Sequence, residues 1–177
     1  MPDLKYVSGL SALDRKLKEL PKKISSRVLR KSVLAGAGLI KRATSKRVPV
    51  GKKARRRGGR VVQPGVMRKA LVNKFAKELS NDTQAAYVVT FRRGKKQQEQ
   101  GRDAYYAPWV ERGHKIVPRK SSKQGGLLLR TLVARRLSAN RFVRPYPSLG
   151  PAFEASKEQA LQAMVKRMEA ELKKVIG

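Results

Sequence analysis

The sequence contains no cysteine and only one histidine among its 177 residues. Disulfide bonds and thiolate chemistry are therefore excluded, which fits a reducing compartment. Metal sites built from several histidines are excluded as well. No run of about 18 apolar residues occurs, so we expect neither a membrane-spanning helix nor a membrane partner. The first ten residues lack the basic start and apolar core of a secretory signal peptide, and none is predicted.

Acidic residues are scarce and unevenly distributed. The chain has 12 Asp or Glu against 43 Lys or Arg, which gives a net charge of +31. No acid occurs from Leu20 to Lys77, where 19 basic residues lie, or from Arg112 to Phe153, where ten lie. Repulsion among so many positive charges destabilises a compact state and favours polyanionic partners, either nucleic acid or acidic proteins.

The residues needed for catalysis are also missing. His114 lies in a basic Gly-His-Lys context that is typical of a surface position. Glu171-Leu172-Lys173 has the acid-x-lysine spacing of some nucleases, but two-metal chemistry needs two or three converging carboxylates. No strand-borne acid accompanies it, and no phosphate-binding G-x-x-x-x-G-K-[ST] loop occurs. We therefore predict that the chain is not an enzyme and takes no cofactor and no metal.

Three segments have the spacing of amphipathic helices. Residues 8–20 carry leucines three and four positions apart. A long helix is predicted to start at Pro21 and to end at Val48-Pro49, since the residue before a proline disfavours the helical region. Pro151 opens a last helix that runs to Ile176. The predicted apolar stripe of that helix consists of Phe153, Leu161, Met164, Val165, Met168, Leu172 and Val175.

Small residues interrupt the long helix at Ala35-Gly36-Ala37-Gly38. A dinucleotide-binding loop would need a preceding strand and a third glycine, and both are absent here. We expect these residues to let another helix approach closely.

The middle of the chain predicts a small antiparallel sheet. Residues 67–79 form either a strand or a helix, residues 80–82 supply turn residues, and residues 84–92 form a strand. Tyr87 and Phe91 on this strand are expected in the core rather than as RNA-stacking aromatics. Residues 94–103 are polar, with glycines near both ends, and predict a mobile loop.

These elements predict one α+β domain over residues 1–177. Its small antiparallel sheet is packed by the long helix of the N-terminal half and by the C-terminal amphipathic helix. Two basic extensions are expected, a loop over residues 49–66 and an irregular insertion over residues 114–140. Within the insertion, residues 127–137 form an apolar run whose helix or strand state stays open.

The most basic segment is residues 48–65, VPVGKKARRRGGRVVQPG. We expect it to lie outside the core and to contact nucleic acid or another polyanion through phosphate groups, without reading bases. Docking on acidic neighbouring proteins, or a merely solvated loop, are the alternatives. The predicted contact residues are Lys52, Lys53, Arg55, Arg56, Arg57 and Arg60.

Several short motifs follow one another in a characteristic order. Gly9-Leu10 with the leucines up to Leu20 leads into the long helix, which ends at Arg47-Val48-Pro49-Val50 and is followed by Gly65 to Lys69. Residues 105–113, YYAPWVERG, match the pattern Y-A-x-x-V-E-x-G. The segments FVRP, at residues 142–145, and PAFE, at residues 151–154, share the pattern P-F-x-R-P-A, split by residues 146–150.

In this order the motifs cover most of the chain, which resembles the tail-completion or neck protein family of long-tailed (siphovirus-type) bacteriophages. His114 stands where the family usually has threonine, the two basic extensions look like insertions, and the charge exceeds that expected of the family. The motif residues with a structural or interface role are Tyr105, Tyr106, Trp109, Glu111, Gly113, Phe142, Arg144, Pro145, Pro151 and Phe153.

The resemblance implies a structural virion protein that completes the head-proximal end of the tail and helps to join head and tail around the DNA passage. It implies copies of the chain in a hexameric ring, next to tail-terminator, head-closure or tail-tube proteins and near packaged DNA. The location would be the virion neck or tail, and the host cytoplasm during assembly. The alternative is a sequence-nonspecific nucleic-acid-binding protein of the ribosome- or nucleoid-associated type.

Residues 105–113 have two compatible interpretations. In the first they form a packed corner, with Trp109 and the tyrosines in the core and Glu111 accepting hydrogen bonds from nearby backbone donors. In the second they form a contact between subunits. We expect the packed corner to be their main role.

Overall fold

The computed structural model describes residues 10–57, 60–115 and 141–176. The fold is α+β, as predicted. The elements in chain order are α1 (Leu10–Glu19), α2 (Lys22–Arg47), β1 (Arg55–Arg57), β2 (Arg60–Val62), α3 (Val66–Ala70), β3 (Leu71–Phe75), the 3₁₀ helix η2 (Lys77–Leu79), β4 (Tyr87–Phe91), α4 (Lys95–Glu99), α5 (Ala107–Arg112), β5 (His114–Lys115), β6 (Phe142–Val143) and α7 (Leu149–Ile176).

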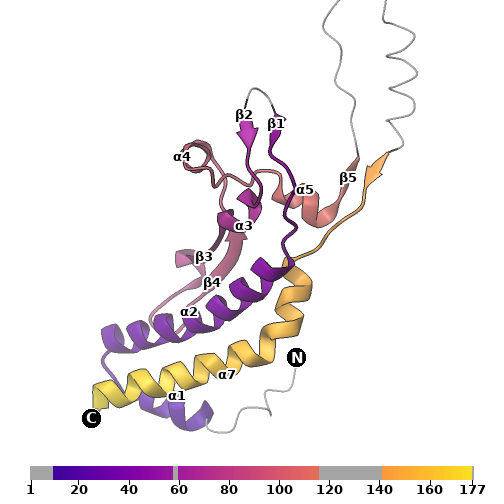
Figure 1. Cartoon of the computed structure of the whole chain (residues 1–177). Helices are drawn as coiled ribbons and strands as arrows, with labels where there is room; N and C mark the ends of the chain where they lie inside the picture. The colour runs from indigo at the N-terminus through magenta and orange to yellow at the C-terminus, as the bar shows by residue number, and fades with distance from the viewer. Residues whose placement is uncertain (1–9, 58–59, 116–140, 177) are drawn as a thin grey trace, which may run out of the picture.

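The two long helices α2 and α7 lie side by side along much of their length (Figure 1). Gly36 lies at their contact, where a Cβ atom would come within 2.6 Å of Met164 Cγ and 3.0 Å of the Ala160 carbonyl oxygen. The prediction that small residues of α2 admit a second helix is therefore confirmed. At the lower end of the pair, α1 packs against α7 and adds Leu13 and Leu17 to a cluster with Val28 and Leu172.

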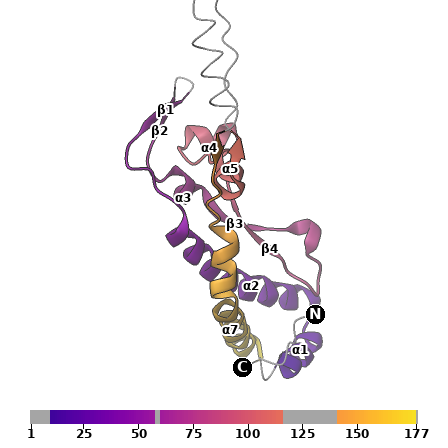
Figure 2. The ribbon, with the colours of Figure 1, turned by 90° about the vertical axis from the view of Figure 1, so that its right-hand side faces the viewer.

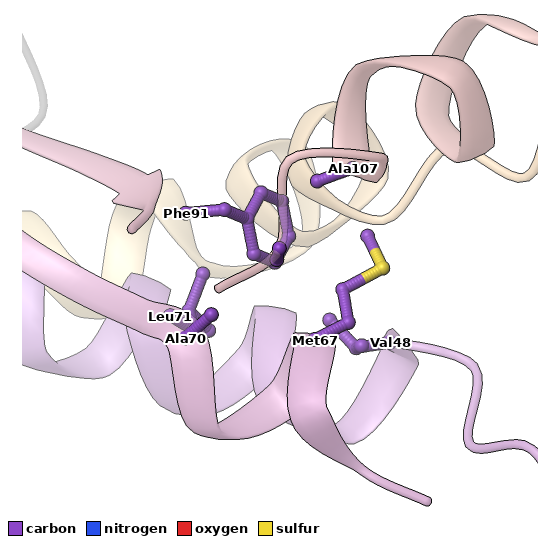
Figure 3. Close-up of a cluster of buried hydrophobic side chains, with 7 residues drawn as sticks. Val48, Met67, Ala70, Leu71, Phe91 and Ala107 are labelled. Atoms are coloured by element: carbon purple, nitrogen blue, oxygen red, sulfur yellow. The ribbon is translucent and has the colours of Figure 1, made fainter. Parts of the chain in front are cut away.

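The helix α2 also packs against the two-stranded sheet of β3 and β4. These strands are antiparallel, with Leu71 opposite Phe91 and Phe75 opposite Tyr87. The main core lies where the sheet meets the end of α2 and the start of α5 (Figure 3). Its buried residues are Val48, Met67, Ala70, Leu71, Phe91, Ala104 and Ala107.

The ends of α2 follow the predicted signals. Pro21 has an extended backbone, so the helix begins at Lys22, one residue later than predicted. It ends at Arg47, and the following Val48 has the extended conformation that suits the residue before Pro49. The segment 67–79 proves to be mixed, since α3 ends at Ala70 and β3 begins at Leu71. Asn81 Oδ1 accepts a hydrogen bond from Thr83 N at 3.0 Å, which confirms the turn between β3 and β4.

Several predictions are corrected. Residues 94–103 contain the short helix α4, and the last helix begins at Leu149 rather than at Pro151. The expected loop over residues 49–66 contains an antiparallel hairpin of β1 and β2, so we call residues 49–66 the basic hairpin segment. Of the insertion 114–140, the structure describes only β5, and residues 127–137 lie outside the described residues.

Candidate interaction surface

The helix α5 ends at a glycine that the local geometry requires. Gly113 has φ 72° and ψ 171°, a conformation that residues with a Cβ atom rarely adopt. A Cβ atom here would also come within 2.5 Å of the Val143 carbonyl oxygen and 2.7 Å of Phe142 Cζ. Glycine therefore lets the chain turn directly from α5 into the β5–β6 pair, in which His114 lies opposite Val143.

The carboxylate of Glu111 connects α5 to the beginning of α7. It accepts hydrogen bonds from the backbone N–H of Ser148 at 2.9 Å and of Leu149 at 3.3 Å, and from the Ser148 hydroxyl. These amides lie at the start of α7, on Leu149 and on the residue before it, where backbone donors lack partners within the helix and a negative charge is favourable. The prediction that Glu111 accepts hydrogen bonds from backbone donors is confirmed.

Four large side chains near this junction are open to solvent: Tyr105, Trp109, Phe142 and Tyr146, which together we call the aromatic surface. Trp109 is 46% exposed and Tyr105 40%, while Phe142 and Tyr146 are each 55% exposed. The Tyr105 ring is nearly perpendicular to that of Trp109, with centroids 5.9 Å apart. The Trp109 and His114 rings are 6.0 Å apart.

The expectation that Trp109 and the tyrosines lie in the core is wrong for Trp109 and Tyr105. The buried positions of this corner are taken by Ala104 and Ala107, which are 0% and 1% exposed. Only Tyr106 packs against the core, and its burial raises the pKa of the phenol. The small alanines bring the start of α5 close to the sheet and leave the larger rings outside.

The remaining motif residues are also exposed. Arg144 and Pro145 lie in the extended segment after β6, and Pro151 and Phe153 lie in the first turns of α7. Phe153 is 47% exposed, so its predicted place in the apolar stripe is wrong; the same is true of Val175, which is 41% exposed.

The basic hairpin segment lies at the same end of the molecule as α5 and the β5–β6 pair, away from α1 and the C-terminus (Figures 1 and 2). In the hairpin, Arg55 is opposite Val62 and Arg57 is opposite Arg60. Lys52 and Lys53, just before β1, are exposed. The structure thus describes the backbone that carries Arg55, Arg56, Arg57 and Arg60, and it places that backbone outside the two buried clusters.

Two cavities were not predicted from the sequence. One, of about 370 Å³, lies between α2 and β4. The other, of about 500 Å³, lies between α1, the start of α2 and the turn after η2, and carries residues of both charges. The signal for the first was visible in the sequence, since Arg27, Arg30 and Lys31 fall on one face of a helix. Its partner on β4 could not be inferred from helical spacing.

A charged cluster adjoins the first cavity. Glu171 on α7 is 5% exposed, and its carboxylate pairs with Lys31 at 2.6 Å, Arg167 at 2.8 Å and Lys174 at 3.7 Å. The hydrogen bond from Lys31, helped by the other cations, lowers the pKa of Glu171, although burial acts in the opposite direction. This carboxylate therefore stays ionised and links α2 to α7.

The described part of the chain offers no group of three or more His, Asp or Glu side chains that could hold a metal ion. Over residues 10–57, 60–115 and 141–176, none of the helices has both the length and the hydropathy that a membrane crossing requires. Comparisons of the chain with protein-family models, with curated proteins and with solved structures found no match.

Proposed function

We propose that the chain is a structural virion protein of a phage neck or tail. In this role, copies form a ring that completes the head-proximal end of the tail and helps to join it to the head around the DNA passage. The proposal rests on the family resemblance and is carried by one observation, the aromatic surface at the motif residues. The rings of Tyr105 and Trp109, which were expected in the core, are exposed together with that of Phe142 and are available for a partner.

Aromatic side chains are enriched in the buried centres of protein interfaces, where Trp and Tyr often supply much of the binding energy. The aromatic surface is supported by rigid neighbours, because Glu111 fixes α5 to α7 and Gly113 fixes the turn into β5. Such a preorganised surface loses little conformational freedom on binding. A subunit contact therefore suits it better than a solvated corner does.

The charge of the chain bears on when a ring forms. Subunits at +31 repel one another strongly at low ionic strength. We expect a monomer or a weak oligomer in isolation, and a ring once DNA or acidic neck proteins neutralise the charge. A stable free ring at low salt in sedimentation velocity would contradict this expectation.

The basic hairpin segment supports a second candidate function, that of a sequence-nonspecific nucleic-acid-binding protein. The two candidates differ in what they ask of the aromatic surface. A neck subunit needs it for contacts between copies or with neighbouring proteins. A free nucleic-acid-binding protein of this charge needs only its Lys and Arg side chains to contact phosphates.

The single tryptophan allows a direct test, since Trp109 fluorescence reports on the aromatic surface alone. Protein is titrated with duplex DNA while sedimentation, emission wavelength and iodide quenching are recorded. The neck proposal predicts that oligomers form on the neutralised protein, and that Trp109 emission then shifts to shorter wavelength and becomes protected from quenching.

Phe142→Ser should abolish both changes and leave DNA affinity intact, since Phe142 lies on the aromatic surface and carries no charge. The matched control is Leu79→Ser, which alters an even more exposed residue, 62% exposed, outside the aromatic surface. If DNA binds without assembly and Trp109 stays quenchable, the nucleic-acid-binding alternative is favoured. Portal, head-closure and tail-tube genes beside the coding gene would independently support the neck proposal.

A further inference from the structure

The cavity of about 370 Å³ between α2 and β4 combines cationic and apolar walls. Within the part of the chain that the structure describes, no acidic residue lines it. Its lining residues are Ser26, Arg27, Arg30, Lys31, Leu34 and Tyr87.

Three cationic side chains lie on one face of α2, and nearby carboxylates neutralise little of their charge. Arg27, Arg30 and Lys31 are three or four residues apart, where like charges on a helix repel one another. Lys31 reaches Glu171, but that carboxylate is shared with two further cations. Among the described residues, no carboxylate pairs with Arg27 or Arg30 within 4.0 Å. The walls therefore carry a surplus of positive charge that a bound anion would neutralise.

Phe75 on β3, next to the cavity, holds two of its lining residues in place. The Arg30 guanidinium lies 4.5 Å from the centroid of the Phe75 ring, a cation–π contact. The same Phe75 ring packs against Tyr87, with centroids 5.3 Å apart and an interplanar angle of 60°. One ring of β3 thus supports both a cation and an aromatic residue of the cavity, and the two are positioned before any ligand arrives.

We propose that this cavity binds single-stranded nucleic acid, with a phosphate between Arg27 and Arg30 and the adjoining base against Leu34 and Tyr87. Single strands are typically held by cations that follow the backbone together with aromatic side chains that contact the bases. The planar guanidinium groups suit phosphate oxygens, which they bind in pairs of hydrogen bonds. An acidic peptide would use the cations but would leave Leu34 and Tyr87 without a matching group.

This site is independent of the neck proposal, because it involves neither the aromatic surface nor the basic hairpin segment. Its test therefore uses variants that leave both regions unchanged. Arg27→Gln/Arg30→Gln removes two charges from the cavity. Arg42→Gln/Lys46→Gln removes two charges from the same helix about 20 Å further along, at a rise of about 1.5 Å per residue, and serves as the matched control.

The probe is a fluorescently labelled single strand of about six nucleotides, short enough to occupy one such site, followed by anisotropy at several salt concentrations. We expect the cavity variant to bind about tenfold more weakly, and its slope of log affinity against log salt to fall by about 0.7 for each lost phosphate contact. The control variant should change affinity by less than about twofold, because its charges are distant from the site.

Tyr87→Leu separates base contact from simple charge attraction. It should weaken binding of the labelled strand by at least about fivefold, while the affinity for inorganic tripolyphosphate stays unchanged. Because Arg30→Gln also removes the contact with Phe75, thermal unfolding is measured for each variant. If Arg30→Gln unfolds the protein, Arg27→Gln alone carries the test.

Equal losses in the cavity and control variants would mean that the strand responds to diffuse charge, and this would overturn the proposal. An unchanged strand affinity in Tyr87→Leu would reduce the site to an anion site without base contact, which also contradicts it. Polyglutamate of matched charge that binds as tightly as the strand, and loses that binding in Arg27→Gln, would assign the cavity to an acidic protein partner instead.

Discussion

Replacing each of two neighbouring glycines of α2 with alanine should have opposite effects on stability. Alanine is favoured over glycine inside a helix by about 1 kcal/mol. At Gly38 no atom lies within 4 Å of the new Cβ, so Gly38→Ala should stabilise the protein by about 0.5–1 kcal/mol. At Gly36 the same Cβ clashes with the Met164 side chain, whose Cγ lies at 2.6 Å, and comes within 3.0 Å of the Ala160 carbonyl oxygen.

The steric cost at Gly36 should exceed the gain in helix propensity. Inserting a methyl group into a close-packed contact costs about 1–3 kcal/mol. Met164 can change its rotamer, but the Ala160 oxygen belongs to the backbone of α7 and moves only if the two helices separate. Gly36→Ala should therefore lower the free energy of unfolding by up to about 2 kcal/mol after the helical gain of about 1 kcal/mol is subtracted.

The assay is urea unfolding followed by circular dichroism at moderate salt. The difference between the two variants isolates the steric cost, since the helical gain is common to both, and should be about 1–3 kcal/mol. A third and a fourth protein, Met164→Ala with and without Gly36→Ala, complete a double-mutant cycle. Met164→Ala should cost less in the Gly36→Ala background. Equal stabilisation by both glycine replacements would refute the close approach of α2 and α7.

Four further predictions concern individual contacts. Trp109→Ala should change the free energy of unfolding by less than about 1 kcal/mol, as for other exposed sites, so a loss of about 3–5 kcal/mol in thermal melts would show that the ring is buried. Glu111→Ala should lower the free energy of unfolding by about 1–3 kcal/mol, because it leaves amides at the start of α7 without an acceptor. The control Glu154→Ala should change it by no more than about 0.5 kcal/mol. Equal effects of the two variants in urea unfolding would refute the capping role. Because the pKa of Glu171 is lowered, this carboxylate contributes its full stability above the ordinary carboxyl pKa and loses it as pH falls through the lowered value. Glu171→Gln should therefore flatten the acid side of the curve of stability against pH. An unchanged curve would contradict this. Replacing all six Lys and Arg of the basic hairpin segment with Gln should reduce the salt slope of duplex-DNA binding by about 0.9 per lost phosphate contact, with equal loss across sequences; binding that hardly changes, with tail-less particles, would indicate docking on protein.

The helical framework could be predicted because its signals are local. Pro21 and Val48-Pro49 fix the ends of α2 through backbone restrictions that do not depend on the rest of the fold. The small residues around Gly36 also indicated a close contact, although the sequence did not show that α7 supplies it. Gly58-Gly59 between two basic segments was an available signal for the β1–β2 hairpin, since such a dipeptide favours two-residue hairpin turns.

The exposed aromatics and the cavity depend on contacts between distant segments. A large aromatic residue is expected inside, but Ala104 and Ala107 bring α5 so close to the sheet that Trp109 has no room there. Arg27 and Tyr87 are 60 positions apart, and only the packing of α2 on β4 brings them to one cavity. Their chemistry was visible in the sequence, but the distance between them was not.

The hydrogen bonds between Glu111 and the start of α7 have a consequence for how firmly this helix is attached. Residues 111 and 148 are joined there, and the β5–β6 pair closes the chain again at His114 and Val143. Two separate contacts therefore hold the segment that leads into α7 against α5 and β5. Because the two do not share a residue, a substitution at Glu111 removes only one of them, and the pairing of His114 with Val143 still keeps the start of α7 beside α5.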